Sequence, residues 1–91
     1  MLSFDRLPGA DLIAAGLRDL EAGVESRAAL LVAIGARRLE RLGVHVPATP
    51  DAPERRLYAL LAREHGDGAH SQYNALVRRL VSFERALACA S

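Results

Sequence analysis

The region from residue 70 to residue 90 carries the pattern that most constrains how this chain can fold. Apolar residues recur there at spacings of three and four, which is the period of one stripe along an α-helix. The members of the stripe are Tyr73, Leu76, Val77, Leu80, Phe83 and Leu87, and Arg78, Arg79 and Arg85 fall on the opposite side. Because such a stripe must be covered by other elements, the pattern predicts a long C-terminal helix packed on a core.

Glu84 is the exception within this stripe. At about 100° per residue it projects between Val77 and Leu80. A carboxylate on a buried face must find a partner or lose its charge. We therefore expect a buried ion pair between Glu84 and an arginine of a facing helix, for which Arg38 is the best placed. Replacing Glu84 with glutamine should then lower the melting temperature, because one side of a buried pair is lost.

Two helices are predicted in the first half of the chain. The first covers residues 10–22, with Ile13, Leu17, Leu20 and Val24 facing inward and Gly23 in the left-handed position beyond its end. The second covers residues 26–42, with Ser26 or Glu25 as its cap. Its first half is apolar on nearly every side, which is typical of a central helix. Gly35 within it predicts the close approach of a neighbouring helix.

A proline-rich connection follows, because Pro47, Pro50 and Pro53 preclude a helix there. Asp51 and Glu54 are predicted to form a capping pair for the next helix, with Pro53 in its first turn. That helix covers residues 52–65, with its leucines inward: Leu57, Leu60 and Leu61. Residues 66–68 form a turn, after which Asp67 or Ser71 caps the last helix.

These elements predict an all-α fold, a compact four-helix bundle with short loops and one proline-rich connection. The 91 residues are expected to form a single helical domain. The second helix has more apolar faces than a small protein readily covers. A homodimer that buries the surplus is therefore expected.

Composition limits the function classes. The formal net charge is +1, so no large basic field attracts nucleic acid or anionic lipid. All of the basic residues are arginine, which indicates GC-rich, bacterial coding. The lone Cys89 excludes an internal disulfide, and the N-terminus lacks the features of a signal peptide. The longest uncharged run is far shorter than a membrane span needs, so a cytoplasmic protein is expected.

No cofactor is expected, and no metal site. The three histidines, His45, His65 and His70, are too few and too scattered. The closest set is Glu64, His65, Asp67 and His70, which lacks the spacing that places ligands on one helix face, since His65 and His70 are five apart across a glycine turn. The leading hypothesis is therefore a non-enzymatic protein–protein interaction module, which either self-associates or serves as a companion or regulatory subunit. Arg37, Arg38 and Arg41 lie on one broad face of the second helix and are the predicted partner-binding residues. Arginine is enriched at interfaces and would dock on an acidic protein surface.

An alternative is supported by Arg63 and His70, which have six residues between them, and by Tyr73, which follows. This spacing is similar to the Arg-x(4–6)-His signature of the higher eukaryote and prokaryote nucleotide-binding family. The resemblance implies a small, all-helical, metal-independent ribonuclease in which the arginine and the histidine lie together on a helix. Arg63 would stabilise phosphate charge, and His70 would act as acid or base.

A second alternative is DNA binding. The helix over residues 52–65, the turn and the last helix look like a helix-turn-helix. The outward residues of the recognition helix would be Ser71, Gln72, Asn74, Arg78 and Arg79.

Overall fold

The computed structural model describes residues 6–90, and within that range the fold consists of helices and turns, with no strand. The helices are α1 (Ala10–Glu21), α2 (Arg27–Ile34), α3 (Ala36–Arg41), α4 (Pro53–His65) and α5 (Ala69–Ala90), with a short 3₁₀ helix, η1 (Gly66–Gly68), before α5. The prediction of an all-α fold is confirmed. In this range no helix combines the length and the apolarity that crossing a bilayer requires.

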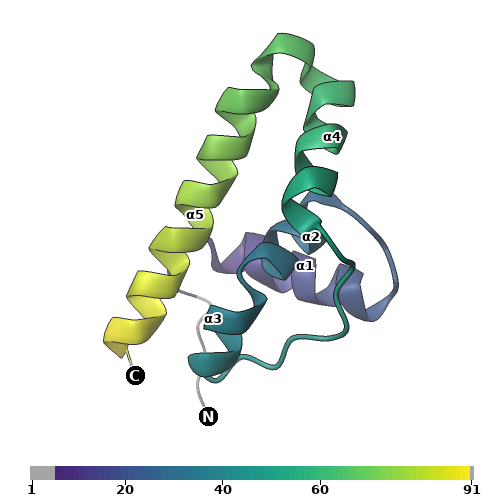
Figure 1. The fold of residues 1–91 in the computed structure, drawn as a ribbon. Coiled ribbons are helices and arrows are strands. Elements are labelled where there is room, and N and C mark those ends of the chain that lie inside the picture. Colours follow the sequence, from purple (N-terminus) through teal and green to yellow (C-terminus); the bar gives the residue numbers. More distant parts are fainter. Residues whose placement is uncertain (1–5, 91) are drawn as a thin grey trace.

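The helix α2 lies at the centre of the fold, as its apolar sequence predicts. Every residue from 28 to 33 is buried, and α1, α4 and α5 pack around it (Figure 1). Ser26 caps the helix: its Oγ accepts a hydrogen bond from the Ala29 amide at 3.1 Å and donates one to Asp19 Oδ2 at 2.6 Å. The cap therefore also ties the start of α2 to the end of α1.

The predicted single helix over residues 26–42 is wrong, because it divides at Gly35. The backbone there has φ −92° and ψ 8°, which ends α2, and α3 begins at the next residue. A Cβ added to Gly35 would lie 2.9 Å from both Glu84 Oε2 and Leu80 Cδ1, so the predicted close approach of another helix is correct. Beyond this break α3 lies to one side of α1 and α4, toward the C-terminal half of α5 (Figure 1).

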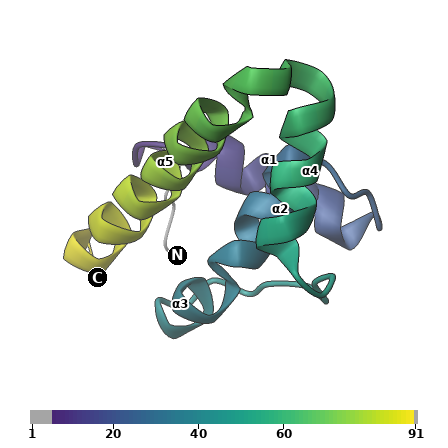
Figure 2. The same cartoon turned by 45° about the horizontal axis from the view of Figure 1, so that its top comes forward.

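The helix α1 crosses α2 at Gly16. A Cβ there would lie 2.5 Å from Val32 Cγ2 and would also collide with the Ala28 carbonyl, so the two backbones are nearly in contact. Figures 1 and 2 show α1 crosswise to α4 and α5 rather than alongside them, and a regular four-helix bundle is not confirmed. Gly23 has the predicted left-handed conformation, with φ 74°. Val24 is 51% exposed, and its predicted inward position is wrong because α1 ends at Glu21.

The connection between α3 and α4 is irregular, and Pro53 is the first residue of α4, both as predicted. The predicted capping pair is wrong. The residue that precedes α4, Ala52, has a left-handed backbone with φ 47° and makes no side-chain cap. Asp51 instead accepts hydrogen bonds from Arg56, through its carbonyl oxygen at 2.8 Å and through Oδ1 at 3.0 Å.

The helices α4 and α5 form a hairpin, in which the chain runs along α4 to the turn at η1 and returns along α5 (Figure 1). Near the turn the rings of Tyr58 and Tyr73 lie 5.8 Å apart. The predicted caps of α5 are both wrong, because Asp67 lies within η1 and Ser71 within α5, which begins directly after Gly68. The buried side of α5 comprises Ala69, Leu76, Leu80, Phe83, Glu84 and Leu87, which packs with Leu57 and Leu61 in one core.

Candidate functional site

The structure brings Glu84 and Arg38 together. Glu84 is 6% exposed and is the only buried charged residue among those described. Its Oε1 lies 3.7 Å from Arg38 Nε, a distance that gives an ion pair but is too long for a hydrogen bond. The Arg38 side chain is 57% exposed, so only one partner of the pair is buried.

This arrangement leaves the carboxylate poorly compensated. Burial raises the pKa of Glu84 above the ordinary glutamate value, and the nearby Arg38 guanidinium lowers it by a smaller amount. The free-energy cost of removing the charged carboxylate from water thus exceeds the electrostatic stabilisation that it gains from one largely solvated arginine. Glu84 therefore takes up a proton more readily than an exposed glutamate does.

The predicted partner-binding residues lie on α3. Arg37, Arg38 and Arg41 are all exposed, and we call them the arginine face. Leu39, which is fully buried, anchors the helix beneath them. Among residues 6–90, no carboxylate lies within ion-pair distance of Arg37 or Arg41. Two of the three arginines therefore have no ion-pair partner in this range, and all three are accessible to solvent.

The residues of the nuclease alternative lie on two helices. Arg63 belongs to α4, and η1 separates it from His70, the second residue of α5. His70 is exposed, with its Nε2 3.2 Å from Asn74 Nδ2. Tyr73 is half-buried, and its burial, with the charge of Glu54, raises the pKa of its hydroxyl. The single-helix placement of arginine and histidine that the resemblance implies is therefore not met.

The residues of the DNA-binding alternative are only partly available. Ser71, Gln72, Arg78 and Arg79 are exposed on α5, while Asn74 is half-buried beside His70. Arg79 NH2 lies 3.6 Å from Asp11 Oδ1 of α1. A Cβ on Gly9 would lie 3.2 Å from the Arg79 carbonyl oxygen, so the chain leading into α1 approaches this side of α5 closely.

Arg56 was not singled out from the sequence, although it connects three segments. Besides its hydrogen bonds to Asp51 it binds the Glu25 carboxylate through NH1, at 3.2 and 3.3 Å. The Arg56 guanidinium holds the pKa of Asp51 below its usual value. Glu25 is far away in sequence, so no local spacing could have revealed this contact.

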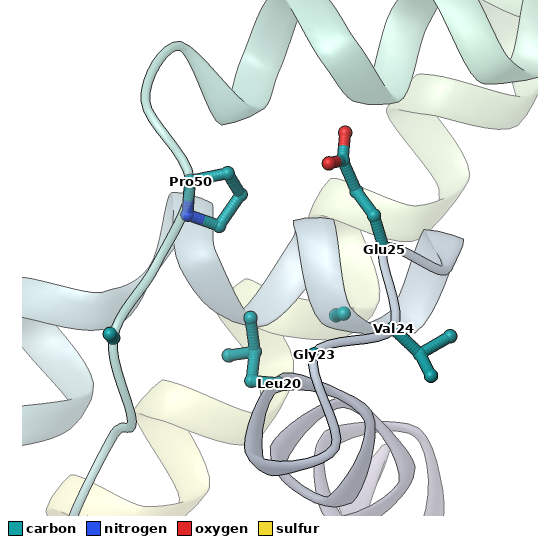
Figure 3. Close-up of a pocket in the computed structure, with 7 residues that line it drawn as sticks. Leu20, Gly23, Val24, Glu25 and Pro50 are labelled. Atoms are coloured by element: carbon teal, nitrogen blue, oxygen red, sulfur yellow. The ribbon is translucent and has the colours of Figure 1, made fainter.

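A pocket of about 140 Å³ opens between the end of α1 and the proline-rich connection. Figure 3 shows Leu20 and Pro50 on either side of it, with Glu25 pointing toward α4. The remaining lining residues are Gly23, Val24, Ala29 and Ala48. Because the Glu25 carboxylate is already bound to Arg56, the lining offers no free charged group to orient a ligand.

Metal binding finds no support in the described part of the chain, where no group of three or more histidine, cysteine, aspartate or glutamate side chains comes together. Cys89 is free and exposed near the end of α5.

The chain matches no protein-family model, no curated protein and no solved structure.

Proposed function

We propose that the protein is a non-enzymatic interaction module that docks through the arginine face of α3 onto an acidic surface of a partner protein. The observation that carries the proposal is the exposure of three arginines on one short helix, two of them without a carboxylate partner in the described range. In a chain of net charge +1, this concentrates positive charge at one place. Guanidinium groups bind carboxylates in fixed, bidentate geometry, which favours a specific contact.

The position of α3 supports the same proposal. The break at Gly35 turns the helix aside from the α1–α2 crossing, and Leu39 alone of its residues is buried. The arginine face is thus presented on an element that contributes little to the core. A partner can cover it without disturbing the packing of α2.

The experiment compares two double variants of equal charge. Arg37→Glu with Arg41→Glu reverses the face while retaining the Arg38–Glu84 pair. Arg55→Glu with Arg63→Glu makes the same change of charge on α4, where both arginines are exposed and lack a carboxylate partner in the described range. A partner captured by the wild type is identified by mass spectrometry, purified and titrated against all three proteins, each checked for native helix content.

We expect the α3 double variant to bind at least about tenfold more weakly, and the α4 double variant to bind nearly as the wild type does. The wild-type affinity should fall as salt is raised, because the contact is electrostatic. An equal loss of affinity in both double variants would show that net charge, and not the arginine face, determines binding. Undiminished binding by the α3 variant would refute the proposed face.

The nucleic-acid alternatives are separated by two further assays. Cleavage of RNA by the wild type that is lost in His70→Ala would favour the ribonuclease. A retarded DNA band at low salt, abolished by Arg78→Ala, would favour the DNA-binding protein. Because Arg79 is paired with Asp11 and Arg63 lies on a different helix from His70, these two functions have less support than the interaction module.

A further inference from the structure

The carboxylate of Glu84 occupies the point where α2, α3 and α5 meet. One oxygen, Oε2, lies against Gly35 at the junction of α2 and α3, where a Cβ would be 2.9 Å away. The other, Oε1, faces Arg38 on α3 at 3.7 Å. A residue of α5 thus contacts both the start of α3 and one of its arginines.

Few other contacts hold α3 in place. Of its six residues only Leu39 is buried. The Val44 amide donates to the Leu39 carbonyl oxygen at 2.9 Å, but this bond closes the end of α3 on the following connection rather than on another helix. Among the described residues, the ion pair between Arg38 and Glu84 is the only one that joins α3 to a neighbouring helix.

Arg38 is the charged group that pairs with the Glu84 carboxylate, and the other charged side chains of α3 and of the neighbouring part of α5 point to solvent. Arg37 and Arg41 on α3 and Arg85 on α5 are exposed, and Glu40 faces solvent. On the described elements, Arg38 is the charged group that acts on the pKa of Glu84, opposing the effect of burial. A single proton therefore decides whether the pair exists.

We infer that Glu84 is a positioning residue for the arginine face: its ionised carboxylate holds Arg38, and with it α3, against α5, and its protonation loosens the helix. The biological use of this contact depends on the proposed function, since a loosened arginine face binds a partner less well. Opening of α3 separates Arg38 from the carboxylate, whereas the burial of Glu84 beside Gly35, at the end of α2, and Leu80, on α5, is not relieved by this local opening. Protonation therefore loosens α3 locally even though it stabilises the folded chain as a whole. Because Arg38 is largely solvated, we expect protonation to increase the opening of α3 about two- to fivefold.

The test is made on the free protein with three variants. Glu84→Gln removes the charge, Arg38→Gln removes the partner, and Arg37→Gln is the matched control, an exposed arginine on the same helix without a carboxylate partner in the described range. The Glu84 carboxyl resonance is identified by its loss in Glu84→Gln and followed by NMR from pH 3 to pH 8. Amide exchange in α3 is measured for each protein at matched pH.

The inference requires the pKa of Glu84 to lie above that of exposed glutamates, to rise further in Arg38→Gln and to stay unchanged in Arg37→Gln. At pH 7, α3 should exchange about two- to fivefold faster in Glu84→Gln and Arg38→Gln than in the wild type and the control. Equal exchange of α3 in the wild type and Glu84→Gln at pH 7 would overturn it, as would equal pKa shifts in the two arginine variants. Since no partner is present, failure here leaves the proposed docking face standing.

Discussion

At the scale of single residues, the chain combines one buried acid with one exposed base. Removing either partner of a fully buried ion pair leaves an uncompensated buried charge, which is why such pairs are costly to break. Here Arg38 remains solvated when Glu84 is replaced, so no orphaned charge is created. The lower melting temperature that the sequence predicts for Glu84→Gln assumes a buried pair, and in the structure only Glu84 of the two residues is buried.

We predict that Glu84→Gln is at least as stable as the wild type at pH 7. Burial raises the pKa of Glu84 above 4.5, so between pH 4.5 and the raised pKa the native state holds a proton that the unfolded chain has released. The stability that this group contributes is thus lost as the pH rises through that window. Denaturant unfolding of both proteins from pH 4 to pH 8 should show that the free energy of unfolding of the variant rises relative to that of the wild type as the pH increases.

Glu40→Gln is the control for this comparison, because Glu40 is exposed on α3 and has no ion-pair partner among the described residues. Its stability should follow that of the wild type at every pH. If instead the wild type gained on Glu84→Gln with rising pH, the carboxylate would be stabilised in its charged form and the assigned direction of its pKa would be wrong.

Gly16 gives a second prediction at this scale. An alanine there has no room, because its Cβ would meet the backbone of Ala28 and the side chain of Val32. We expect Gly16→Ala to lower the free energy of unfolding by about 1–3 kcal/mol, the usual cost of overpacking, despite the better helix propensity of alanine. Gly68→Ala is the control, since its Cβ would lie 3.6 Å from His65 Cβ, an ordinary contact. Thermal or denaturant unfolding that ranked the two variants equally would contradict the close crossing of α1 and α2.

At the scale of elements, the spacing of apolar residues predicted which side of a helix is buried and which helix is central. Leu76, Leu80, Phe83 and Leu87 are buried on α5 because their spacing matches the helical period, and α2 is central because its sequence has no polar side. The break at Gly35 could not be predicted from its neighbours. Glycine is tolerated within helices, and whether it ends one here depends on the approach of Leu80 and Glu84, which are distant in sequence.

At the candidate site too, local spacing predicted some features and missed those that depend on contacts across the fold. The spacing on α5 placed Glu84 within the stripe, but only the fold shows that its partner is solvated. Asp51 was interpreted as a cap because of its distance from Glu54, a local pattern. In the structure Arg56 binds it instead, since the same guanidinium also reaches Glu25 across the fold.

The contacts of Arg56 predict the behaviour of the proline-rich connection. Arg56→Gln removes the bonds that hold Asp51 and Glu25 to the start of α4, so residues 43–52 should open more often. We expect faster cleavage in this segment by a nonspecific protease under native conditions, with little change in helix content. Arg55→Gln is the matched control, because the adjacent Arg55 is exposed and has no carboxylate partner in the described range. Equal cleavage of the two variants would show that Arg56 does not restrain the connection.

At the scale of the whole molecule, the central helix α2 does not need a second copy of the chain to cover it. The dimer was expected to cover a surplus of apolar surface on the central helix. That surface is covered within the chain, since residues 28–33 of α2 are all buried beneath α1, α4 and α5. Among the described residues the large exposed hydrophobic side chains are Val24 and Tyr58, on different parts of the fold.

We therefore predict that the free protein is a monomer of 9.8 kDa at micromolar concentration. Two separated hydrophobic side chains do not supply the roughly 1,200 Å² or more of buried area that stable interfaces have. Sedimentation equilibrium or light scattering over a hundredfold range of concentration measures the mass directly. A mass of twice the chain at the lowest concentration would restore the predicted homodimer and would require an interface built from other residues.

Because Gly35 has no side chain, the substitutions that evolution can accept at position 35 depend on the residues of α5 that lie against it. Glu84 fits only because Gly35 leaves space for its carboxylate, and a Cβ at Gly35 would lie as close to Leu80 as to Glu84. A lineage that acquired alanine at position 35 would have to shorten residue 84, to aspartate for example, and also to reduce residue 80 before α3 could keep its place. Position 35 should therefore vary together with positions 80 and 84, and a larger residue at position 35 should occur only where both of those residues are smaller.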